Sequence, residues 1–164
     1  MDYKAPESHE ATVEDRYSTT LKIKDKEYSV DVLDTAGEED FQNMLDMWVN
    51  FADGILLVFA VNERESLEIA KNKRERILKS KGALNKMPIV LVGNKQDLEN
   101  ERQVTSTEAI TLANTWGIKY IETSAKTNFN CTEAFTLLAE EIINERDNSS
   151  KKHRCCKCWC CPFI

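Results

Sequence analysis

Three short segments of this 164-residue chain combine side chains that can bind a polar or charged ligand. They are Asp34–Gly37 (DTAG), Asn94–Asp97 (NKQD) and Glu122–Lys126 (ETSAK). A carboxylate can hold Mg²⁺ through water, and a glycine lets the backbone approach a phosphate closely because no Cβ intervenes. A carboxylate can also accept two parallel hydrogen bonds from neighbouring N–H groups. These segments are candidates for ligand binding if the fold brings them together.

A predicted strand precedes each of the three segments. Alternating apolar residues over Tyr17–Ile23 and again over 28–32 predict a β-hairpin that ends just before DTAG. Ile55–Val61 is apolar throughout, which is typical of a strand buried on both faces. Ile89–Val92 and Tyr120–Ile121 repeat that character on a smaller scale, just before NKQD and ETSAK.

Helical periodicity alternates with these strands. It covers residues 65–80, 106–116 and 131–146, and the second of these helices opens with a capping box from Thr105 to Glu108. A hairpin followed by alternating strands and helices predicts an α/β fold whose sheet is mostly parallel and covered on both faces. Ligands bind beyond the carboxyl ends of the strands in such sheets, and this is where the three segments fall.

Charge is divided unevenly along the chain, which narrows the possible partners. The net charge is −6, but the last fourteen residues hold four Lys/Arg and no acid, so residues 1–150 carry 18 basic and 28 acidic residues. An acidic body does not suit a phosphate backbone, so we expect no nucleic-acid partner. A short basic tail suits an anionic membrane surface. The longest apolar run, Ile55–Val61, is too short to span a bilayer, and the first residues lack a secretory signal.

Cysteine is concentrated in the same tail. Only Cys131 of the six cysteines lies outside it, so a disulfide framework is excluded. Cys161–Ile164 (CPFI) fits the C-a-a-X prenylation box. One lipid anchors a protein marginally, and palmitoylated cysteines or basic residues supply the second signal. The candidates for lipidation are Cys161, Cys155, Cys156, Cys158 and Cys160. The alternative, a zinc-binding knot, has a spacing too tight for a two-loop site.

DTAG, NKQD and ETSAK, in this order and spacing, closely resemble the small GTPases of the Ras family. Thr12–Tyr17 resembles the first switch, or effector, loop of that family. The gap between NKQD and ETSAK leaves no room for the extra helix of Rho-type relatives, so the resemblance is closest to the Ras branch. It implies a Ras-like P-loop NTPase fold over residues 1–146, followed by a flexible, basic, lipidated tail at 147–164 outside the fold.

The resemblance implies a site for a guanine nucleotide, GTP or GDP. Asp97 would accept hydrogen bonds from the ring N–H and the exocyclic amine of guanine, whereas adenine would leave this carboxylate unpaired. The backbone N–H of Ala125 would bind the guanine oxygen, while the other residues brace the loops and cover the base. The nucleotide-binding residues of these two motifs are Asn94, Lys95, Asp97, Ser124, Ala125 and Lys126.

The phosphate and metal end of the implied site involves four residues. Thr12 and Asp34 would hold Mg²⁺, and Thr12 and Gly37 would contact the phosphates. Thr12, Asp34 and Gly37 are therefore also predicted to be nucleotide-binding residues. An ordinary loop remains the alternative at Thr12, because Ala11 replaces the family's usual proline. The catalytic residues would be Gly37 and Glu38. Glu38 stands where the family has the glutamine that positions the attacking water, so we expect slow hydrolysis of GTP.

The phosphate-cradling motif G-x-x-x-x-G-K-[ST] is not found, since the first glycine of the sequence is Gly37. In the family this loop joins a strand in the middle of the sheet to the first helix. We expect that strand and helix to be missing, which would leave the neighbouring strands without ladder partners. A sequence that began upstream is the favoured explanation, and a true variant without the loop is the alternative.

Three hypotheses follow for the function. The first is a Ras-like switch that binds GTP with Mg²⁺ and hydrolyses it to GDP and phosphate. Its partners would be effector, exchange-factor and GTPase-activating proteins, with effector contacts through 10–17 and 37–50, where an apolar cluster is either core or a partner surface. A lipid anchor would hold it on the cytoplasmic face of the plasma membrane or an endomembrane. The second hypothesis is a non-hydrolysing, membrane-tethered binding module, and the third is a fragment that does not fold alone.

Overall fold

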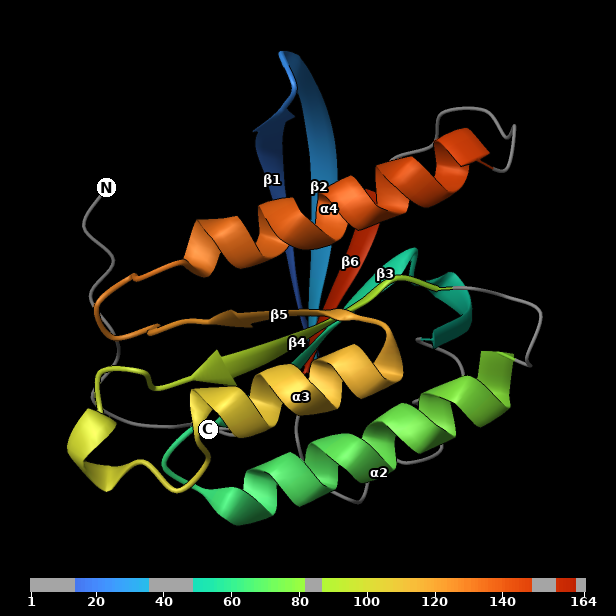
Figure 1. The fold of residues 1–164 in the computed structure, drawn as a ribbon. Coiled ribbons are helices and arrows are strands. Elements are labelled where there is room, and N and C mark those ends of the chain that lie inside the picture. The colour runs from blue at the N-terminus through green and yellow to red at the C-terminus, as the bar shows by residue number, and fades with distance from the viewer. Residues whose placement is uncertain (1–13, 36–48, 82–86, 149–155, 162–164) are drawn as a thin grey trace.

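The computed structural model describes residues 14–35, 49–81, 87–148 and 156–161 (Figure 1). The strands are β1 (Glu14–Ile23), β2 (Lys26–Thr35), β3 (Gly54–Ala60), β4 (Ile89–Asn94), β5 (Lys119–Glu122) and β6 (Cys156–Cys161). The helices are α2 (Arg64–Lys81), α3 (Ser106–Trp116) and α4 (Cys131–Asn148), with a short 3₁₀ turn at Glu99–Glu101. The α/β class predicted from the sequence is confirmed, and the predicted helix bounds agree to within two residues.

The strands form one sheet in the order β1-β2-β6-β3-β4-β5. Only the β1–β2 pair is antiparallel, and the other four neighbouring pairs are parallel. The β1–β2 pair is the predicted hairpin, closed by Lys24 and Asp25 with φ of 46° and 65°. Positive φ at both central residues defines the turn whose twist matches that of the flanking strands. From β2 to β5, all carboxyl ends therefore lie at one edge of the sheet.

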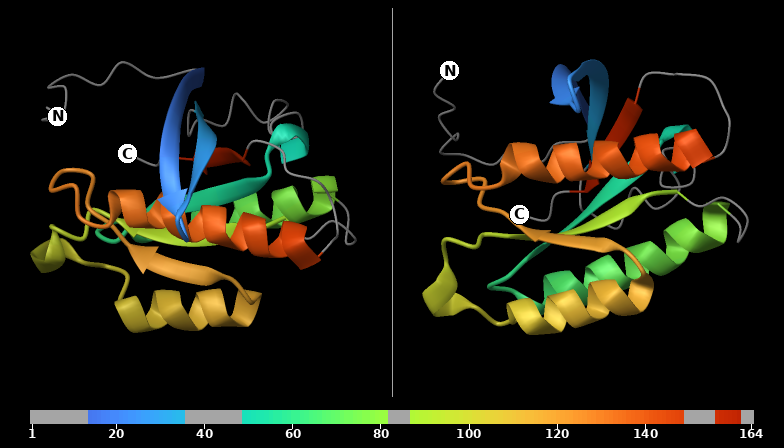
Figure 2. Two further views of the ribbon diagram at one scale, coloured as in Figure 1. Left: turned by 90° about the horizontal axis from the view of Figure 1, so that it is seen from above. Right: turned by 45° about the horizontal axis from the view of Figure 1, so that its top comes forward.

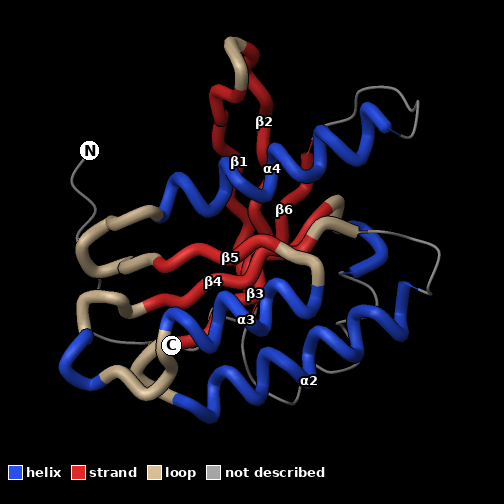
Figure 3. Tube along the Cα trace, viewed as in Figure 1, coloured by secondary structure: helices blue, strands red, loops and turns tan. Residues whose placement is uncertain are grey.

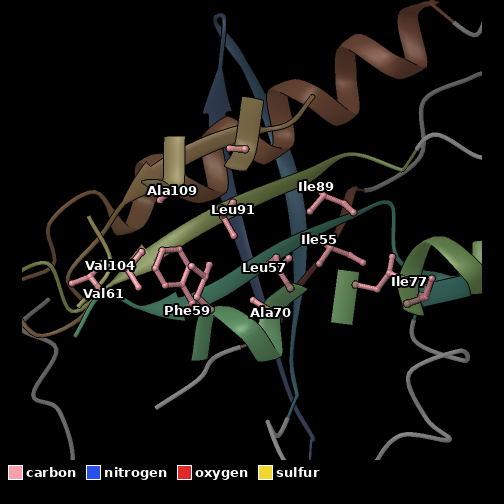
Figure 4. Packing of buried hydrophobic residues seen from close by; sticks show 13 residues of the cluster. Ile55, Leu57, Phe59, Val61, Ala70, Ile77, Ile89, Leu91, Val104 and Ala109 are labelled. Atoms are coloured by element: carbon pink, nitrogen blue, oxygen red, sulfur yellow. The ribbon is translucent and has the colours of Figure 1, made fainter. Parts of the chain in front are cut away.

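Helices cover both faces of the sheet, with α2 and α3 on one face and α4 on the other (Figure 2). Strand β3 is buried along its whole length, as its uniformly apolar sequence predicts. Ile55, Leu57 and Phe59 belong to the core under α2 and α3 (Figure 4), while Leu56 and Val58 belong to the core under α4. This alternation follows from the two-residue period of a strand.

The beginning of β3 is tied closely to the last turns of α4. A Cβ added at Gly54 would lie 2.8 Å from Ile142 Cδ1 and 2.9 Å from Leu138 Cδ1, so a larger residue here would require these two side chains to shift. One residue earlier, Asp53 pairs with Arg146 of α4 at 2.6 Å. Helix α4 therefore runs back across the sheet and ends near the edge where the parallel strands begin.

The structure differs from the sequence prediction at the tail. Residues 147–164 were expected to lie outside the fold, but α4 continues to Asn148 and Cys156–Cys161 forms β6 inside the sheet. The strand pairs in parallel with β2 over Val30–Asp34 and with β3 over Gly54–Leu57. The expectation of unpartnered strands in the middle of the sheet is therefore corrected as well. The physical reason is that buried backbone N–H and C=O groups need partners, and this segment supplies them.

Within the described ranges, no helix combines the length and the hydropathy that a membrane crossing requires.

Candidate functional site

The NKQD and ETSAK segments lie side by side at the carboxyl edge of the sheet (Figure 3). Asn94 is the last residue of β4 and Glu122 is the last residue of β5. The two strands are parallel neighbours, with Gly93 opposite Glu122 in the ladder. The strand register therefore brings together two motifs that lie 24 or more residues apart in the sequence, as predicted.

Backbone hydrogen bonds lock the two loops to each other. Thr123 N–H donates to the carbonyl of Gly93 at 2.9 Å, and Gln96 N–H donates to the carbonyl of Thr123 at 3.0 Å. The side chain of Asn94 adds a third link, because its Oδ1 accepts from Ala125 N–H at 3.2 Å and from Thr123 Oγ1 at 3.3 Å. Asn94 thus braces the second loop from the first.

Asp97 is oriented by a buried hydroxyl. Ser124 Oγ donates to Asp97 Oδ1 at 2.5 Å, and Ser124 is fully buried. Reciprocal backbone hydrogen bonds with Phe129, both 3.0 Å, hold Ser124, and its Oγ also accepts from Thr127 N–H at 3.2 Å. The second oxygen of Asp97 accepts no hydrogen bond from the described residues, and the residue is half-buried. This carboxylate is therefore fixed in direction and retains acceptor capacity.

The predicted site also contains two lysines. Lys95 lies in the same loop as Asp97, and Lys126 lies in the loop that follows β5. Lys95 adopts a left-handed conformation, with φ of 63°, and its carbonyl accepts from Leu98 N–H at 2.9 Å to close the turn. The side chain of Lys95 is half-buried and that of Lys126 is exposed. The turn thus places Lys95 two residues before Asp97 in the same loop.

Glu122 lies at the centre of a polar network at the end of β5. Arg102 donates to both of its oxygens, at 3.1 and 2.9 Å, while Ser106 Oγ and Tyr120 OH donate to Oε1 at 2.7 and 2.8 Å. Burial raises the pKa of Glu122, but the hydrogen bonds from Arg102, Ser106 and Tyr120 outweigh burial, and the net pKa is lowered. Burial, together with the hydrogen bond to Glu122, raises the pKa of Tyr120 well above its usual range.

The remaining predicted site residues are distributed differently. Asp34 lies near the carboxyl end of β2, half-buried, opposite Asp15 of β1 and Cys160 of β6. It shares the carboxyl edge with NKQD and ETSAK, but β6 and β3 lie between β2 and β4. No group of three His, Cys, Asp or Glu side chains suited to a metal occurs among the residues that the structure describes. Thr12, Gly37, Glu38 and Cys155 lie outside the described residues, as does most of the predicted 37–50 effector segment.

The sequence analysis missed the residues that support the two loops. Arg102 and Ser106 hold Glu122 from the segment before and at the start of α3, and Asn130 Nδ2 donates to the Glu122 carbonyl at 3.0 Å. The only signal for such partners was the presence of Glu122, a charged residue at the end of a buried strand, which requires compensation.

A hairpin leading into a parallel α/β sheet, with NKQD and ETSAK interlocked at its carboxyl edge, defines a Ras-like small GTPase. The family model described as the Ras family matches residues 1–144, and the chain belongs to this family. Its members are GTP-binding switches.

Several curated relatives resemble the chain over most of its length. Ras-related protein ralB-A of Xenopus laevis is 38% identical over 164 residues, covering 92% of this chain and 80% of the relative. Ras-related protein Ral-B of Rattus norvegicus has the same identity and coverage. Protein ras-1 of Neurospora crassa is 40% identical over 146 residues, covering 89% of this chain and 68% of the relative.

The Glu122 network generates a prediction about stability. We expect Glu122→Gln to lower the free energy of unfolding by about 1–3 kcal/mol at pH 7, because Arg102 loses its charged acceptor in a poorly hydrated place. The lowered pKa of Glu122 means that its contribution is present above its ordinary pKa of 4.5 and is lost as the pH falls through the folded value. Urea unfolding between pH 3 and 7 measures both effects. As the pH falls, the free energy of unfolding of the variant should decline less than that of the unmodified chain.

The control for this prediction is Glu99→Gln. Glu99 also pairs with Arg102, at 2.7 Å, but its side chain is 64% exposed compared with 17% for Glu122. An exposed pair contributes about 0–1 kcal/mol. Equal losses in the two variants would contradict the importance of the buried network.

Proposed function

We propose that this chain is a guanine-nucleotide switch that binds GTP and GDP at the loops after β4 and β5, hydrolyses GTP slowly, and acts at a membrane through a lipidated tail. The observation that carries the proposal is the hydrogen bond from buried Ser124 to Asp97. It supports a preorganised carboxylate at the sheet edge where ligands bind in folds of this type.

Asp97 is the residue that we assign to recognition of the base. Each carboxylate oxygen has two lone pairs, so the oxygen that accepts from Ser124 can still accept one hydrogen bond from a ligand. Two parallel acceptors match the ring N–H and the exocyclic amine of guanine. Adenine lacks this pair of donors, and its binding would leave the carboxylate unsatisfied.

The neighbouring groups are assigned to the rest of the base. Ala125 N–H is exposed to the surface and donates to Asn94 Oδ1, and we infer that it turns to the guanine oxygen when nucleotide binds. Lys95 and Lys126 cover the base with their alkyl chains, while Ser124 maintains the direction of Asp97. These roles require only small movements of groups that already lie together.

Asp34, together with Thr12, is assigned to Mg²⁺. A carboxylate oxygen is the donor that this hard cation prefers, and Asp34 stands at the carboxyl edge of the sheet, which supports the assignment. When bound, the ion neutralises charge on the phosphates of the nucleotide. Gly37 is assigned to the approach of the backbone to the γ-phosphate, because no Cβ obstructs it.

Glu38 is assigned to the attacking water and is the reason to expect slow turnover. An ionised carboxylate accepts a hydrogen bond from water but cannot donate one to the oxygens of the transferring phosphoryl group. Its charge also repels the phosphates. Exchange factors, GTPase-activating proteins and effectors would then control how long the chain stays in its GTP state, with 10–17 and 37–50 as the effector-contacting segments.

A second candidate function is a membrane-tethered binding module without hydrolysis. The observation that favours it is the sheet itself, in which β6 pairs with both β2 and β3 so that the interior strands have partners without a bound ligand. This function requires cooperative folding in the absence of nucleotide. Binding of GDP or GTP in the presence of Mg²⁺ distinguishes the two candidate functions, because only the switch requires it.

Base recognition is tested by Asp97→Asn. The variant replaces an acceptor by a donor, so we expect the affinity for GDP to fall at least about 100-fold, while a xanthine nucleotide, whose ring carries a second carbonyl, gains affinity. Titration of a fluorescent nucleotide measures both values. Asp25→Asn, at an exposed hairpin turn, is the matched control and should not change either affinity. No measurable binding of GDP or GTP by the unmodified chain would support the binding module instead.

The role of Glu38 is tested by Glu38→Gln. We expect single-turnover hydrolysis of GTP to accelerate about tenfold or more, because the amide donates where the carboxylate repels. Glu39→Gln makes the same change of charge one residue further on and should leave the rate unaltered. If the two variants hydrolyse GTP at the rate of the unmodified chain, Glu38 does not limit the reaction.

The lipid anchor is tested by Cys161→Ser in cells. The C-a-a-X cysteine is the acceptor of the prenyl group, so we expect this variant to lose the lipid mass and to leave the membrane fraction. Cys131→Ser removes a thiol at the start of α4 and serves as the control. An unchanged intact mass and an unchanged membrane fraction for Cys161→Ser would exclude prenylation at this site.

A further inference from the structure

The turn between β5 and α4 carries the hydroxyl that orients Asp97. Asn128 and Asn130 of this turn both adopt the left-handed backbone conformation, with φ of 57° and 54°. Asparagine tolerates this conformation better than most residues, and glycine adopts it without strain. The two asparagines flank Phe129, whose backbone exchanges two hydrogen bonds with that of Ser124, both 3.0 Å. They therefore determine the path of the chain that holds Ser124.

The side chains of these two asparagines differ in their contacts. Asn130 is half-buried, and its Nδ2 donates to the carbonyl of Glu122, the last residue of β5, at 3.0 Å. The carbonyl of Asn130 accepts from Ala134 N–H in the first turn of α4, also at 3.0 Å. Asn128 is exposed, and its side chain makes no hydrogen bond to another described residue. Asn130 alone of the pair therefore links the end of β5 to the start of α4.

A short chain of hydrogen bonds connects this link to Asp97. Closure of the turn places Phe129 opposite Ser124 in an antiparallel bridge, and Cys131 Sγ donates to the Ser124 carbonyl at 3.4 Å. Ser124 Oγ accepts from Thr127 N–H at 3.2 Å and donates to Asp97 Oδ1 at 2.5 Å. A hydroxyl has one proton, so this arrangement commits it to Asp97. The direction of the carboxylate thus depends on the turn remaining closed.

We propose that Asn130 is a positioning residue for guanine recognition, because its carboxamide clamps the turn in which Ser124 directs Asp97 toward the base. This inference rests on the proposed function, since it requires Asp97 to bind guanine. The ring N–H and the exocyclic amine of guanine form a rigid pair of donors. A hydrogen bond weakens steeply when its angle departs from linearity, so a carboxylate that rotates loses the second of these bonds first. The clamp therefore acts on the preference for guanine as well as on affinity.

The clamp is tested first without nucleotide, by amide hydrogen exchange on the full chain and on two glycine variants. Glycine satisfies the left-handed backbone at both positions, so Asn130→Gly and its matched control Asn128→Gly differ in the loss of the side-chain hydrogen bond. We expect the amides of Ser124, Thr127 and Phe129 to exchange about tenfold faster in Asn130→Gly, because local opening of the turn becomes easier. Asn128→Gly should retain the protection of the unmodified chain. Equal exchange in the two variants would overturn the proposal.

The effect on recognition is tested by the affinities for GDP and inosine diphosphate. The hypoxanthine base of inosine diphosphate keeps the ring N–H and lacks the exocyclic amine, so the ratio of the two affinities measures the bond from that amine to Asp97. We expect this ratio to fall by about threefold or more in Asn130→Gly and to stay unchanged in Asn128→Gly. A residue that only stabilises the fold would lower both affinities by the same factor. An unchanged ratio in Asn130→Gly would therefore overturn the proposal.

Asn130→Asp separates the clamp from the stability of α4. Aspartate also tolerates the left-handed conformation, and its charge is favourable at the start of a helix, so this variant keeps the fold. A carboxylate cannot donate to the Glu122 carbonyl, and we expect the same fall in the affinity ratio as in Asn130→Gly. A ratio equal to that of the unmodified chain would contradict the clamp.

Failure of the proposed function has a different signature from failure of the clamp. An unmodified chain that binds neither nucleotide, or that binds GDP and inosine diphosphate equally well, contradicts guanine recognition by Asp97 and with it the role of Asn130. An unmodified chain that prefers GDP, and keeps this preference in both Asn130 variants, contradicts the clamp alone.

Discussion

A strand inside a sheet must pair its backbone on both sides, and the rest of this structure depends on that requirement. Strand β3 is fully buried and lies between β4 and β6, so each of its ladders is enclosed by the two cores. Unpaired N–H and C=O groups in such a place cost about 1–3 kcal/mol each. A typical domain is stable by only about 5–15 kcal/mol, so the loss of a whole ladder on one side of β3 could unfold the domain. The ladders with β4 and β6 therefore keep the backbone of β3 paired on both sides.

The same constraint assembles the candidate nucleotide site. The parallel register of β4 and β5 brings two carboxylates, Asp97 and Glu122, to one edge of the sheet, and their surroundings separate their roles. Glu122 receives hydrogen bonds from Arg102, Ser106 and Tyr120, which lower its pKa and occupy its oxygens. Asp97 receives one hydrogen bond, from Ser124, among the described residues. The first carboxylate stabilises the loop, and the second retains the capacity to bind a ligand.

Much of this architecture could be predicted from local patterns. The uniform apolarity of Ile55–Val61, the capping box at Thr105 and the alternation of the hairpin each report the environment of the residues that carry them. The sequence predicted that NKQD and ETSAK lie at the carboxyl ends of strands, whereas the hydrogen bonds that interlock them became visible only in the structure. The partner of Glu122 could not be predicted, because Arg102 lies twenty positions away and nothing in the sequence between them indicates the contact. The placement of β6 was missed for a different reason, since its cysteines match a lipidation motif and carry no strand periodicity.

The segment Cys156–Cys161 forms a strand in the structure, although its sequence matches a lipidation motif. Cysteine behaves as a small apolar residue in a sheet and as a nucleophile at a membrane, so the composition of Cys156–Cys161 suits both environments. In the sheet, the backbone of this segment pairs with β2 on one side and with β3 on the other.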